Sequence, residues 1–446
     1  MVAIRYVNDY GDGTSGYLDY GSGIVVTTAS GQPIEVTSTS SGVVNIQPVG
    51  VATDAFGRLR SSTPLTLFDS SHRYKDNGLW ATTSGTGGTT VFDADAGLVN
   101  LNVTTTSGSE IIRETTKVFA YQPGKSLLVM STFVINAPKV GLRQRIGYYG
   151  ANNGIYLEKN GNASPRFVER SYVTGALTET SVAQSSWNGI DKLDGTGPSG
   201  ITLDLTKAQI FWMDIEWLGL GTVRMGFVID GKLIHCHSFH HANLITSTYI
   251  TTASLPLRYE IRNTTATASS STLKQICSTV ISEGGYELRG LQQAIGTSIT
   301  APYSLTTAGT FYPVISLRLK TTALDAIVIL TAISIMSAAG TANYAWRVVA
   351  SPTTTAGSWV SAGADSAVEY NLTGTASTGG RILAQGYFSG SNQSHPSIDI
   401  LKEALFKFQL ERDGLAGTPY ELSLLIAASA NTSTVHAAVD WEEISR

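Results

Sequence analysis

The sequence predicts an all-β protein made of two β-sandwich or jelly-roll domains and an extended N-terminal arm. Apolar and polar residues alternate through nearly all of its 446 residues, and glycine- or asparagine-containing turns separate the alternating segments. Only Ile398–Leu405 has a spacing that suits one or two helical turns. A strand with one apolar face has to bury that face against another sheet, so this pattern favours sheets packed in pairs.

The alternation is clearest over residues 210–229. One face of the first strand there is apolar and holds Phe211, Met213, Ile215 and Trp217. Asp214 and Glu216 fall on the other face. Asp230-Gly231 follows a second alternating strand, and this dipeptide suits a type I′ hairpin turn because both central residues need positive φ. We therefore expect an antiparallel hairpin with its turn at Asp230.

Composition excludes several classes of protein. Charged residues make up 14% of the chain, below the roughly 25% typical of globular domains. The net charge of −4 argues against nucleic-acid binding, which needs a basic surface. The chain has no run of 18 apolar residues, so no membrane insertion is expected. Its two cysteines, Cys236 and Cys277, are expected to be buried thiols, as in a protein made in a reducing host cytoplasm and used outside it.

Residues 1–55 differ from the rest of the chain. They are rich in glycine and serine, and their apolar runs are too short to close a core. We interpret the segment as an assembly arm that becomes ordered against a neighbouring subunit or shell. The apolar residues expected to make that contact are Ile24, Val25, Val43, Val44 and Ile46.

Residues 56–285 are predicted to form the first β domain, with a glycine-rich loop over residues 187–200. About ten strands at regular spacing favour a sandwich over an alternating βα fold. The predicted strands are Gly97–Thr104, Glu110–Phe119, Ser126–Ile135, Arg143–Gly150, Gly154–Glu158, Arg166–Val173, Gln209–Trp217, Thr222–Ile229, Lys232–Phe239 and Leu257–Arg262.

Residues 286–446 are predicted to form a second β domain, which begins after the Gly284-Gly285 break and a linker with the sequence LQQAIG. Its clearest strand is Ile315–Lys320, followed by a segment in which Ile327, Ile329 and Ile333 share a face. The remaining predicted strands are Tyr344–Val349, Arg381–Tyr387, Leu405–Leu410, Glu421–Ile426 and Val435–Ile444.

Four of the seven histidines lie close together, which makes this stretch the main candidate for a metal site. In a regular strand, His235 and His237 would point to the same face, and His240 or His241 would supply a third ligand after the bend. However, no carboxylate follows at a set spacing, and a polar strand face or a subunit contact explains the cluster more simply. We therefore predict no metal, with His235, His237 and His240 as the candidates if one binds.

Three other patterns suggest chemistry. Asp214 and Glu216 share a strand face, as the two acids of a glycosidase would. The same pattern of acids also occurs on any strand face that is exposed to solvent. Gly124-Lys125-Ser126 resembles the end of a phosphate-binding loop, yet a strand follows it, so a turn is expected. Asp191 and Asp194 do not provide a full calcium ligand set. We expect no catalytic residues and no cofactor.

Two tryptophans, Trp187 and Trp359, lie in loops of small residues. An exposed loop tryptophan is typical of a sugar-binding surface and also of a subunit contact. The sequence does not distinguish these two interpretations.

Several segments resemble virion structural proteins of marine tailed phages, above all cyanophages. The matching segments cover most of the chain, and three of them are specific: FGRLRSSTP with LFDSSHRYKDNGLW (Phe56–Trp80), RETTKVFAYQPGKSLLV (Arg113–Val129) and GLRQRIGYYGANNGIYLE (Gly141–Glu158). Weaker similarity extends through Arg224–Leu244 and to VDWEEI near the C-terminus. The resemblance implies a particle component and no catalytic residues.

The predicted function is therefore that of a non-enzymatic structural component of a virion: a decoration or fibre-like subunit of the head, neck or tail. Its expected partners are other copies of itself, as a homotrimer, and other virion proteins. The alternatives are a carbohydrate-binding protein that attaches the particle to host surface glycan, and a glycan-cleaving tail enzyme that uses Asp214 and Glu216.

Overall fold

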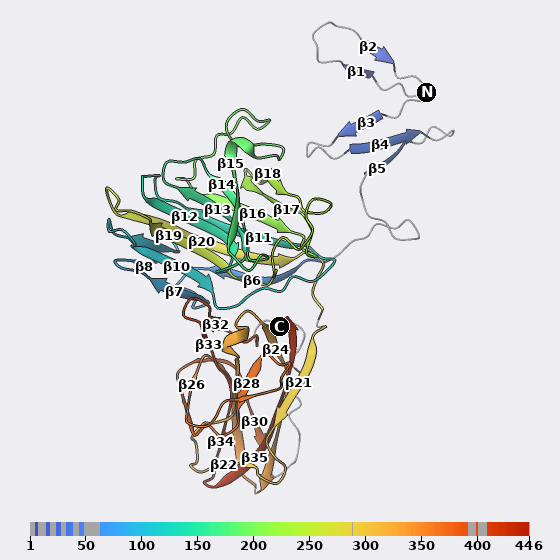
Figure 1. Cartoon of the computed structure of the whole chain (residues 1–446). Helices are drawn as coiled ribbons and strands as arrows, with labels where there is room; N and C mark the ends of the chain where they lie inside the picture. The colour runs from blue at the N-terminus through green and yellow to red at the C-terminus, as the bar shows by residue number, and fades with distance from the viewer. Residues whose placement is uncertain are drawn as a thin grey trace. The chain divides into compact units, whose positions relative to one another are not determined.

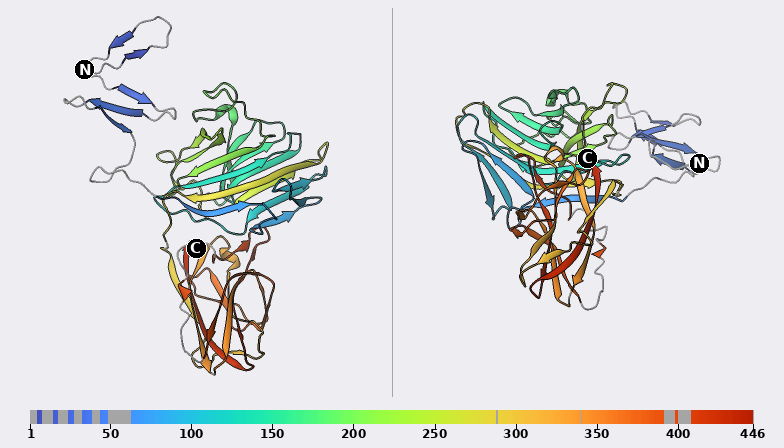
Figure 2. Two further views of the ribbon diagram at one scale, coloured as in Figure 1. Left: turned by 180° about the vertical axis from the view of Figure 1, so that it is seen from behind. Right: turned by 60° about the horizontal axis from the view of Figure 1, so that its bottom comes forward.

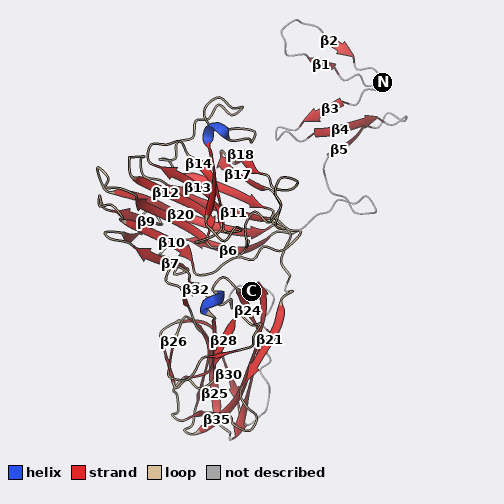
Figure 3. Cartoon of the chain, in the orientation of Figure 1, coloured by secondary structure: helices blue, strands red, loops and turns tan. Residues whose placement is uncertain are grey.

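The computed structural model is all-β, which confirms the predicted fold class (Figures 1 and 3). It describes residues 63–287, 289–339, 341–390 and 408–444, together with the backbone of strands β1–β5, of β31 and of Ser445. These residues contain no α-helix, only the 3₁₀ turns η1 (Gln184–Ser186) and η2 (Thr321–Ala323). The helical turn expected over Ile398–Leu405 lies outside the described residues, apart from β31 (Ile398–Asp399).

The chain divides into two compact units, Met1–Thr63 and Pro64–Arg446. In the first unit, β1 (Arg5–Val7) pairs with β2 (Ser15–Tyr17), and a second small sheet has the order β3 (Ile24–Thr27), β4 (Pro33–Ser38), β5 (Val44–Pro48). The side chains of Ile24, Val25, Val44 and Ile46, and all of Val43, lie outside the described residues. The anchoring role of this segment stays a prediction.

The first sandwich of the larger unit consists of two antiparallel sheets that face each other (Figures 1 and 2). The seven-stranded sheet has the order β15 (Thr178–Ala183), β14 (Arg166–Ser171), β13 (Gly154–Asn160), β12 (Leu142–Tyr149), β19 (Leu257–Asn263), β10 (Glu110–Thr115), β7 (Trp80–Ser84). The eight-stranded sheet has the order β18 (Lys232–Phe239), β17 (Val223–Ile229), β16 (Gln209–Ile215), β11 (Leu127–Val134), β20 (Ser271–Ser282), β9 (Leu98–Val103), β8 (Thr89–Asp93), and β6 (Leu65–Ser71) also pairs with β20.

Residues from both sheets form one apolar core, which includes Phe133, Phe167, Phe211, Phe227 and Tyr259. The predicted hairpin turn is confirmed, since Asp230 and Gly231 have φ values of 51° and 74°. The ten predicted strands are present; the ends of Lys232–Phe239 are as predicted, and each of the other nine is shifted at one or both ends. The longest strand of the sandwich, β20, was missed because Ser, Thr and Lys interrupt its apolar residues.

The second sandwich also pairs two antiparallel sheets. One has the order β21 (Leu291–Gly296), β35 (Ser433–Ser445), β24 (Ile327–Ala339), β31, with β22 (Tyr303–Leu305) also paired to β35. The other has the order β27 (Val360–Ser361), β28 (Val368–Asn371), β23 (Tyr312–Leu319), β34 (Leu422–Ala428), β25 (Asn343–Ala350), β30 (Arg381–Ser389). Two short ribbons complete it: β26 (Thr353–Thr355) with β29 (Ala376–Thr378), and β32 (Arg412–Asp413) with β33 (Thr418–Pro419).

A separate apolar core fills the second sandwich, with Trp346 and Trp441 among its buried residues. Three expectations are wrong here. Ile327 and Ile329 do not share a face with Ile333, because a register shift between Leu330 and Ala332 separates the first two, at the junction, from Ile333 in the core of the second sandwich. The LQQAIG segment is not a linker but the edge strand β21, hydrogen-bonded to β35. Within the described part of the predicted strand Leu405–Leu410, the strand pairing is a single bridge from Gln409 to Ile329.

The two sandwiches are joined by buried contacts. Val118 and Ala120 from the first pack with Ile327 and Ile329 from the second. Gln409 donates a hydrogen bond to the carbonyl oxygen of Val118 at 2.9 Å. These contacts bury apolar surface, which favours a fixed junction between the sandwiches.

Both cysteines are free thiols; Cys236 is buried as expected, whereas Cys277 is half-buried. Among the described residues there is no helix with the length and apolar character that crossing a bilayer requires.

Candidate functional site

The two carboxylates that the sequence suggested as a pair lie at the end of strand β16 and directly after it. Phe211, Met213 and Ile215 point into the core, so Asp214 lies on the outer face of the sheet. Glu216 follows directly after the strand and is exposed. The neighbouring residues on either side of Asp214 are Arg224 in β17 and Leu128 in β11. The predicted division of this segment into an apolar and a polar face is confirmed.

Asp214 and Glu216 line the same cavity, which has a volume of about 570 Å³. We call it the Asp214 hollow. This volume falls within the range of roughly 300–1,000 Å³ that is usual for small-molecule sites. The residues that line the hollow are Tyr121, Gly124, Lys125, Ser126, Asp214, Glu216, Leu218, Thr222 and Arg224. They come from the β16–β17 pair and from the turn before β11.

The carboxyl group of Asp214 is buried, and only one of its two oxygen atoms accepts a hydrogen bond from the described residues. Arg224 donates a hydrogen bond to its Oδ2 atom, while Oδ1 has no hydrogen-bond partner among the described residues. Burial raises the pKa of Asp214, and the nearby carboxylates of Glu283 and Glu216 add to that rise, while Arg224 opposes it. The residue is 6% exposed, whereas the side chain of Arg224 is 59% exposed. Asp214 is therefore the buried member of the pair, and Arg224 is the member that faces solvent.

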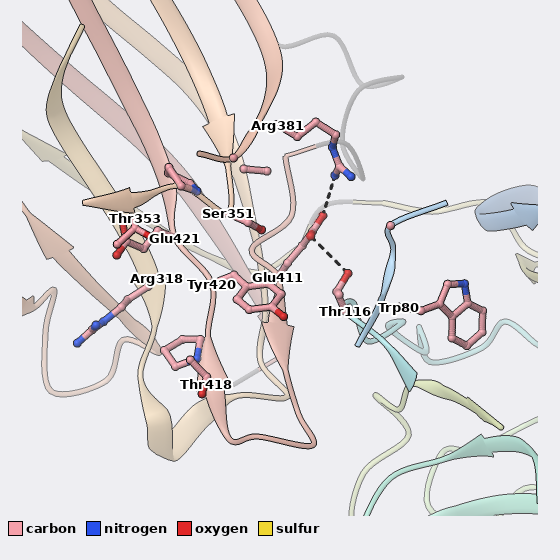
Figure 4. A pocket seen from close by; sticks show the side chains of 15 residues that line it. Trp80, Thr116, Arg318, Ser351, Thr353, Arg381, Glu411, Thr418, Tyr420 and Glu421 are labelled. Carbon is pink, nitrogen blue, oxygen red and sulfur yellow. Dashed lines mark hydrogen bonds and ion pairs between the residues drawn. The ribbon is translucent and has the colours of Figure 1, made fainter. Parts of the chain in front are cut away.

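A second cavity, of about 670 Å³, lies between the two sandwiches (Figure 4). In its wall Glu411 accepts hydrogen bonds from Arg381 at 3.2 Å and from Thr116 at 3.3 Å (Figure 4). Glu421 accepts one from the backbone of Thr354 at 2.8 Å. Both carboxylates of this cavity therefore accept hydrogen bonds from other residues of the chain. Such internal bonds are typical of a structural junction between the two sandwiches.

The histidine cluster does not form the predicted arrangement. The register of β17 and β18 shifts at a β-bulge, so that Gly226 pairs with His235 and Met225 with His237. His235 lies beside Trp212 on the outer face, with ring centroids 6.3 Å apart. His237 lies in the core between Phe167 and Phe239. The expectation that His235 and His237 share a face is wrong, because the extra residue Cys236 reverses the alternation.

The other features of the cluster also differ from those of a metal site. His240 is exposed, and burial lowers the pKa of His237 to about 4, with the charges of His235 and His240 adding to the effect. No set of three His, Cys, Asp or Glu side chains suited to a metal ion occurs in the part of the chain that the structure describes. His241 instead bonds Glu169 at 2.7 Å and the carbonyl oxygen of Gly221 at 2.6 Å.

The two loop tryptophans are in different environments. Trp187 is 1% exposed and stacks on Phe167 at 4.3 Å, while its indole N–H donates to the carbonyl oxygen of Val182. The expectation that Trp187 makes an exposed glycan or subunit contact is therefore wrong. Trp359 is half-buried, and the Arg318 guanidinium lies 4.1 Å from its ring centroid.

Two other predicted loops are structural. Gly124 has a φ of 81°, and Lys125 donates its backbone N–H to Gln122, so Gly124-Lys125-Ser126 is a turn as expected. The carboxylate of Asp191 accepts backbone hydrogen bonds from Leu193 and Ser199, both at 2.8 Å. Asp194 bonds Thr196 in the same way. These contacts hold the loop.

The outer face of the seven-stranded sheet carries a charged layer that was not predicted from the sequence. Arg145 bonds Glu158 at 2.5 Å, and Arg143 bonds Glu260 at 2.6 Å. The buried Tyr156 ring lies 5.0 Å from the Arg145 guanidinium. One sequence signal could have revealed this layer. The two arginines of the segment RQR are spaced by two residues, and matching acids occur on the neighbouring strands. Because these charges pair with each other, the layer strengthens the sheet.

Comparisons with known proteins add little. No protein-family model and no curated protein sequence matches the chain. Among solved structures, the carbohydrate recognition domain of Emp47p matches with 11% identity and a TM-score of 0.31, over 52% of this chain and 99% of that one. A carbohydrate esterase from Shiga toxin-encoding bacteriophage phi24B matches with 12% identity and a TM-score of 0.29, over 49% and 99%. Arcelin-5 from Phaseolus vulgaris matches with 10% identity and a TM-score of 0.30, over 50% and 100%. Such low scores carry no functional argument.

Proposed function

We propose that this protein is a non-enzymatic structural component of a tailed-phage virion, a decoration or fibre-like subunit that works by self-association and by anchoring through its N-terminal segment. The observation that carries the proposal is the fixed junction between the two sandwiches. A subunit that holds neighbours in place needs such a junction, whereas a pair of freely hinged domains would not hold their positions.

The charges at the junction support this role. Glu114 in β10 accepts hydrogen bonds from Arg258 at 3.0 Å and from Arg412 at 2.6 Å. Arg412 belongs to the second sandwich, and its other terminal nitrogen bonds Asp325 at 3.0 Å. The Arg412 and Glu114 side chains are 3% and 1% exposed. A buried charge pair of this kind fixes one geometry, because any other leaves a charge without a partner.

Exposed apolar side chains supply surface for self-association. Single apolar residues at a surface are ordinary, but several of those here are large and almost fully accessible. They are Tyr74, Val140, Leu244, Ile299 and Tyr387, which are between 71% and 93% exposed. Contact between copies would remove this surface from water.

A second candidate function, attachment to host surface glycan, is favoured by one specific observation. The Asp214 hollow contains an aromatic side chain, a carboxylate with an unused acceptor and exposed donors, which together suit a sugar. The particle role and the glycan role are compatible, because a surface subunit can do both.

Purified particles test the main proposal. We expect an antibody to this chain to label intact particles of the phage that encodes it, and a chain-traced density map of the particle to place several copies in contact. Sedimentation of the purified chain should show an oligomer, with a trimer expected. A monomeric chain that is absent from washed particles would overturn the proposal.

A further inference from the structure

We propose that the Asp214 hollow is a binding site for a neutral or amino sugar residue of a glycan, with buried Asp214 accepting a hydrogen bond from a sugar hydroxyl and exposed Arg224 acting as a donor beside it. This assignment rests on the second candidate function, glycan attachment, and is independent of the particle role. It requires binding only, without bond cleavage.

The first argument is the unused acceptor in the hollow. The Oδ1 atom of Asp214 is out of contact with solvent and has no donor among the described residues. A buried polar atom left in this state costs free energy, so a ligand hydroxyl that donates to it is stabilised. Arg224, which bonds the other carboxylate oxygen, is mostly exposed. Its exposure leaves this side chain room to shift, and a ligand hydroxyl that donates to the buried carboxylate would replace the bond that Arg224 gives up.

The second argument is the chemistry of the walls. Tyr121 packs edge-to-face on Trp217, with ring centroids 6.1 Å apart, and this contact fixes an aromatic wall of the hollow. Lys125, Thr222 and Glu216 add donors and acceptors on the other sides. A sugar ring has an apolar face and a rim of hydroxyls, so it matches an aromatic wall with polar groups around it.

The third argument is charge. Asp214 and Glu216 line the hollow. Glu283 accepts a hydrogen bond from Ser126 in the wall, and its charge contributes to the raised pKa of Asp214. Against these three acids stand two bases, Lys125 and Arg224, so the formal balance is one negative charge. A carboxylate-bearing sugar would be repelled at this distance, whereas a neutral or amino sugar would not. The site therefore selects against uronic and sialic acids.

The test compares Asp214→Asn with a matched control, Asp230→Asn, in the full-length chain. Both variants remove one carboxylate from the β16–β18 hairpins, but Asp230 lies in the turn at the other end of β17, where asparagine also tolerates the positive φ. The probes are an array of neutral, amino-sugar and uronic-acid oligosaccharides, followed by calorimetry with the best neutral or amino-sugar trisaccharide. Circular dichroism checks that each variant is folded.

We expect the wild type and Asp230→Asn to bind neutral or amino-sugar oligosaccharides, and Asp214→Asn to bind about tenfold or more weakly. If the wild type binds but Asp214→Asn binds equally well, the glycan function stands and this site assignment is overturned. If the wild type binds none of the probes, or prefers uronic acids, the assignment fails. Release of new reducing ends from a bound probe would overturn the binding-only role.

Discussion

Glu114 accepts hydrogen bonds from two arginines that belong to different sandwiches, and this residue shows how buried charges act in the molecule. Arg258 lies on the neighbouring strand and also lies over the ring of Tyr149, at 5.1 Å from its centroid. Arg412 reaches Glu114 across the junction. Removing one arginine leaves the buried carboxylate of Glu114 with only one of its two charged partners. Loss of a partner from a buried ion pair lowers the free energy of unfolding strongly.

Arg412→Ala should therefore lower the free energy of unfolding by about 3–5 kcal/mol. The matched control is Arg262→Ala. Arg262 also pairs with an acid of β10, Glu110, but the Arg262 side chain is 45% exposed. That variant should lose only about 0–1 kcal/mol. Urea unfolding followed by tryptophan fluorescence measures both. Equal losses in the two variants would contradict the role assigned to Arg412.

His241 gives a prediction about pH. Both ring nitrogens face acceptors, Glu169 and the Gly221 carbonyl oxygen, so the bonded ring carries two protons and a positive charge. Burial alone would lower the pKa of His241, but these two bonds and the Glu169 charge raise it above 6.5. A raised folded pKa means that the stabilisation is complete below about pH 6.5 and is lost as the pH rises through the folded value.

We expect His241→Gln to be less stable than the wild type by about 1–2 kcal/mol near pH 5.5, and the difference to shrink near pH 8.5. Chemical denaturation at both pH values measures this. His240→Gln, a change at the exposed neighbouring residue, is the matched control. A His241→Gln difference that stays constant or grows with pH would show that the ring is neutral in the folded protein.

At the scale of elements, period-two alternation predicted ten strands of the first sandwich and six of the second, because one buried face dictates the pattern. It failed where the chain departs from regular pairing. The bulge at Cys236 inserts one extra residue into β18, and no residue type in the sequence predicts the position of this bulge. Trp187 was predicted as exposed because its loop neighbours are small, yet the loop folds this ring onto Phe167. The Asp214 hollow was only half predictable: its two lining acids lie in β16 and directly after it, but Tyr121 comes from a distant segment.

The bulge can be tested through Gly226, the residue that faces it from β17. A Cβ atom at this position would collide with the carbonyl oxygen of Ile234 in β18. Gly226→Ala should therefore lower the free energy of unfolding by about 1–3 kcal/mol, as overpacking does. At Gly150 the nearest atoms to an added Cβ are 3.8 Å away, so Gly150→Ala should change stability little. Thermal unfolding compares the two variants, and a neutral Gly226→Ala would contradict the bulge geometry.

At the scale of the whole molecule, the chain has two compact units, and the larger one contains both apolar cores. The predicted domain boundaries near residues 55 and 285 stay predictions. Composition did indicate that the N-terminal segment differs from the rest. It did not indicate the short paired strands β1–β5, because backbone pairing can form without the apolar content that marks a core.

Deleting residues 1–55 should leave the two sandwiches folded and abolish incorporation into particles. The reason is that the larger unit begins at Pro64 and has its own cores. Complementation of a phage that lacks the gene, followed by mass spectrometry of purified particles, measures incorporation. As a matched variant, Ile24, Val25, Val44 and Ile46 are changed to serine in the full-length chain. Normal incorporation of both variants would refute the anchoring role.

Strand β35 lies after all of its partners in the chain, since it pairs with β21, β22 and β24 in one sheet. On a translating ribosome, this sheet cannot close until residues 433–445 have emerged. Until then, β24 and β21 expose unpaired backbone and apolar surface, which attract other unfinished chains. We therefore expect a chain that stops before residue 433 to accumulate as insoluble product when it is synthesised in quantity.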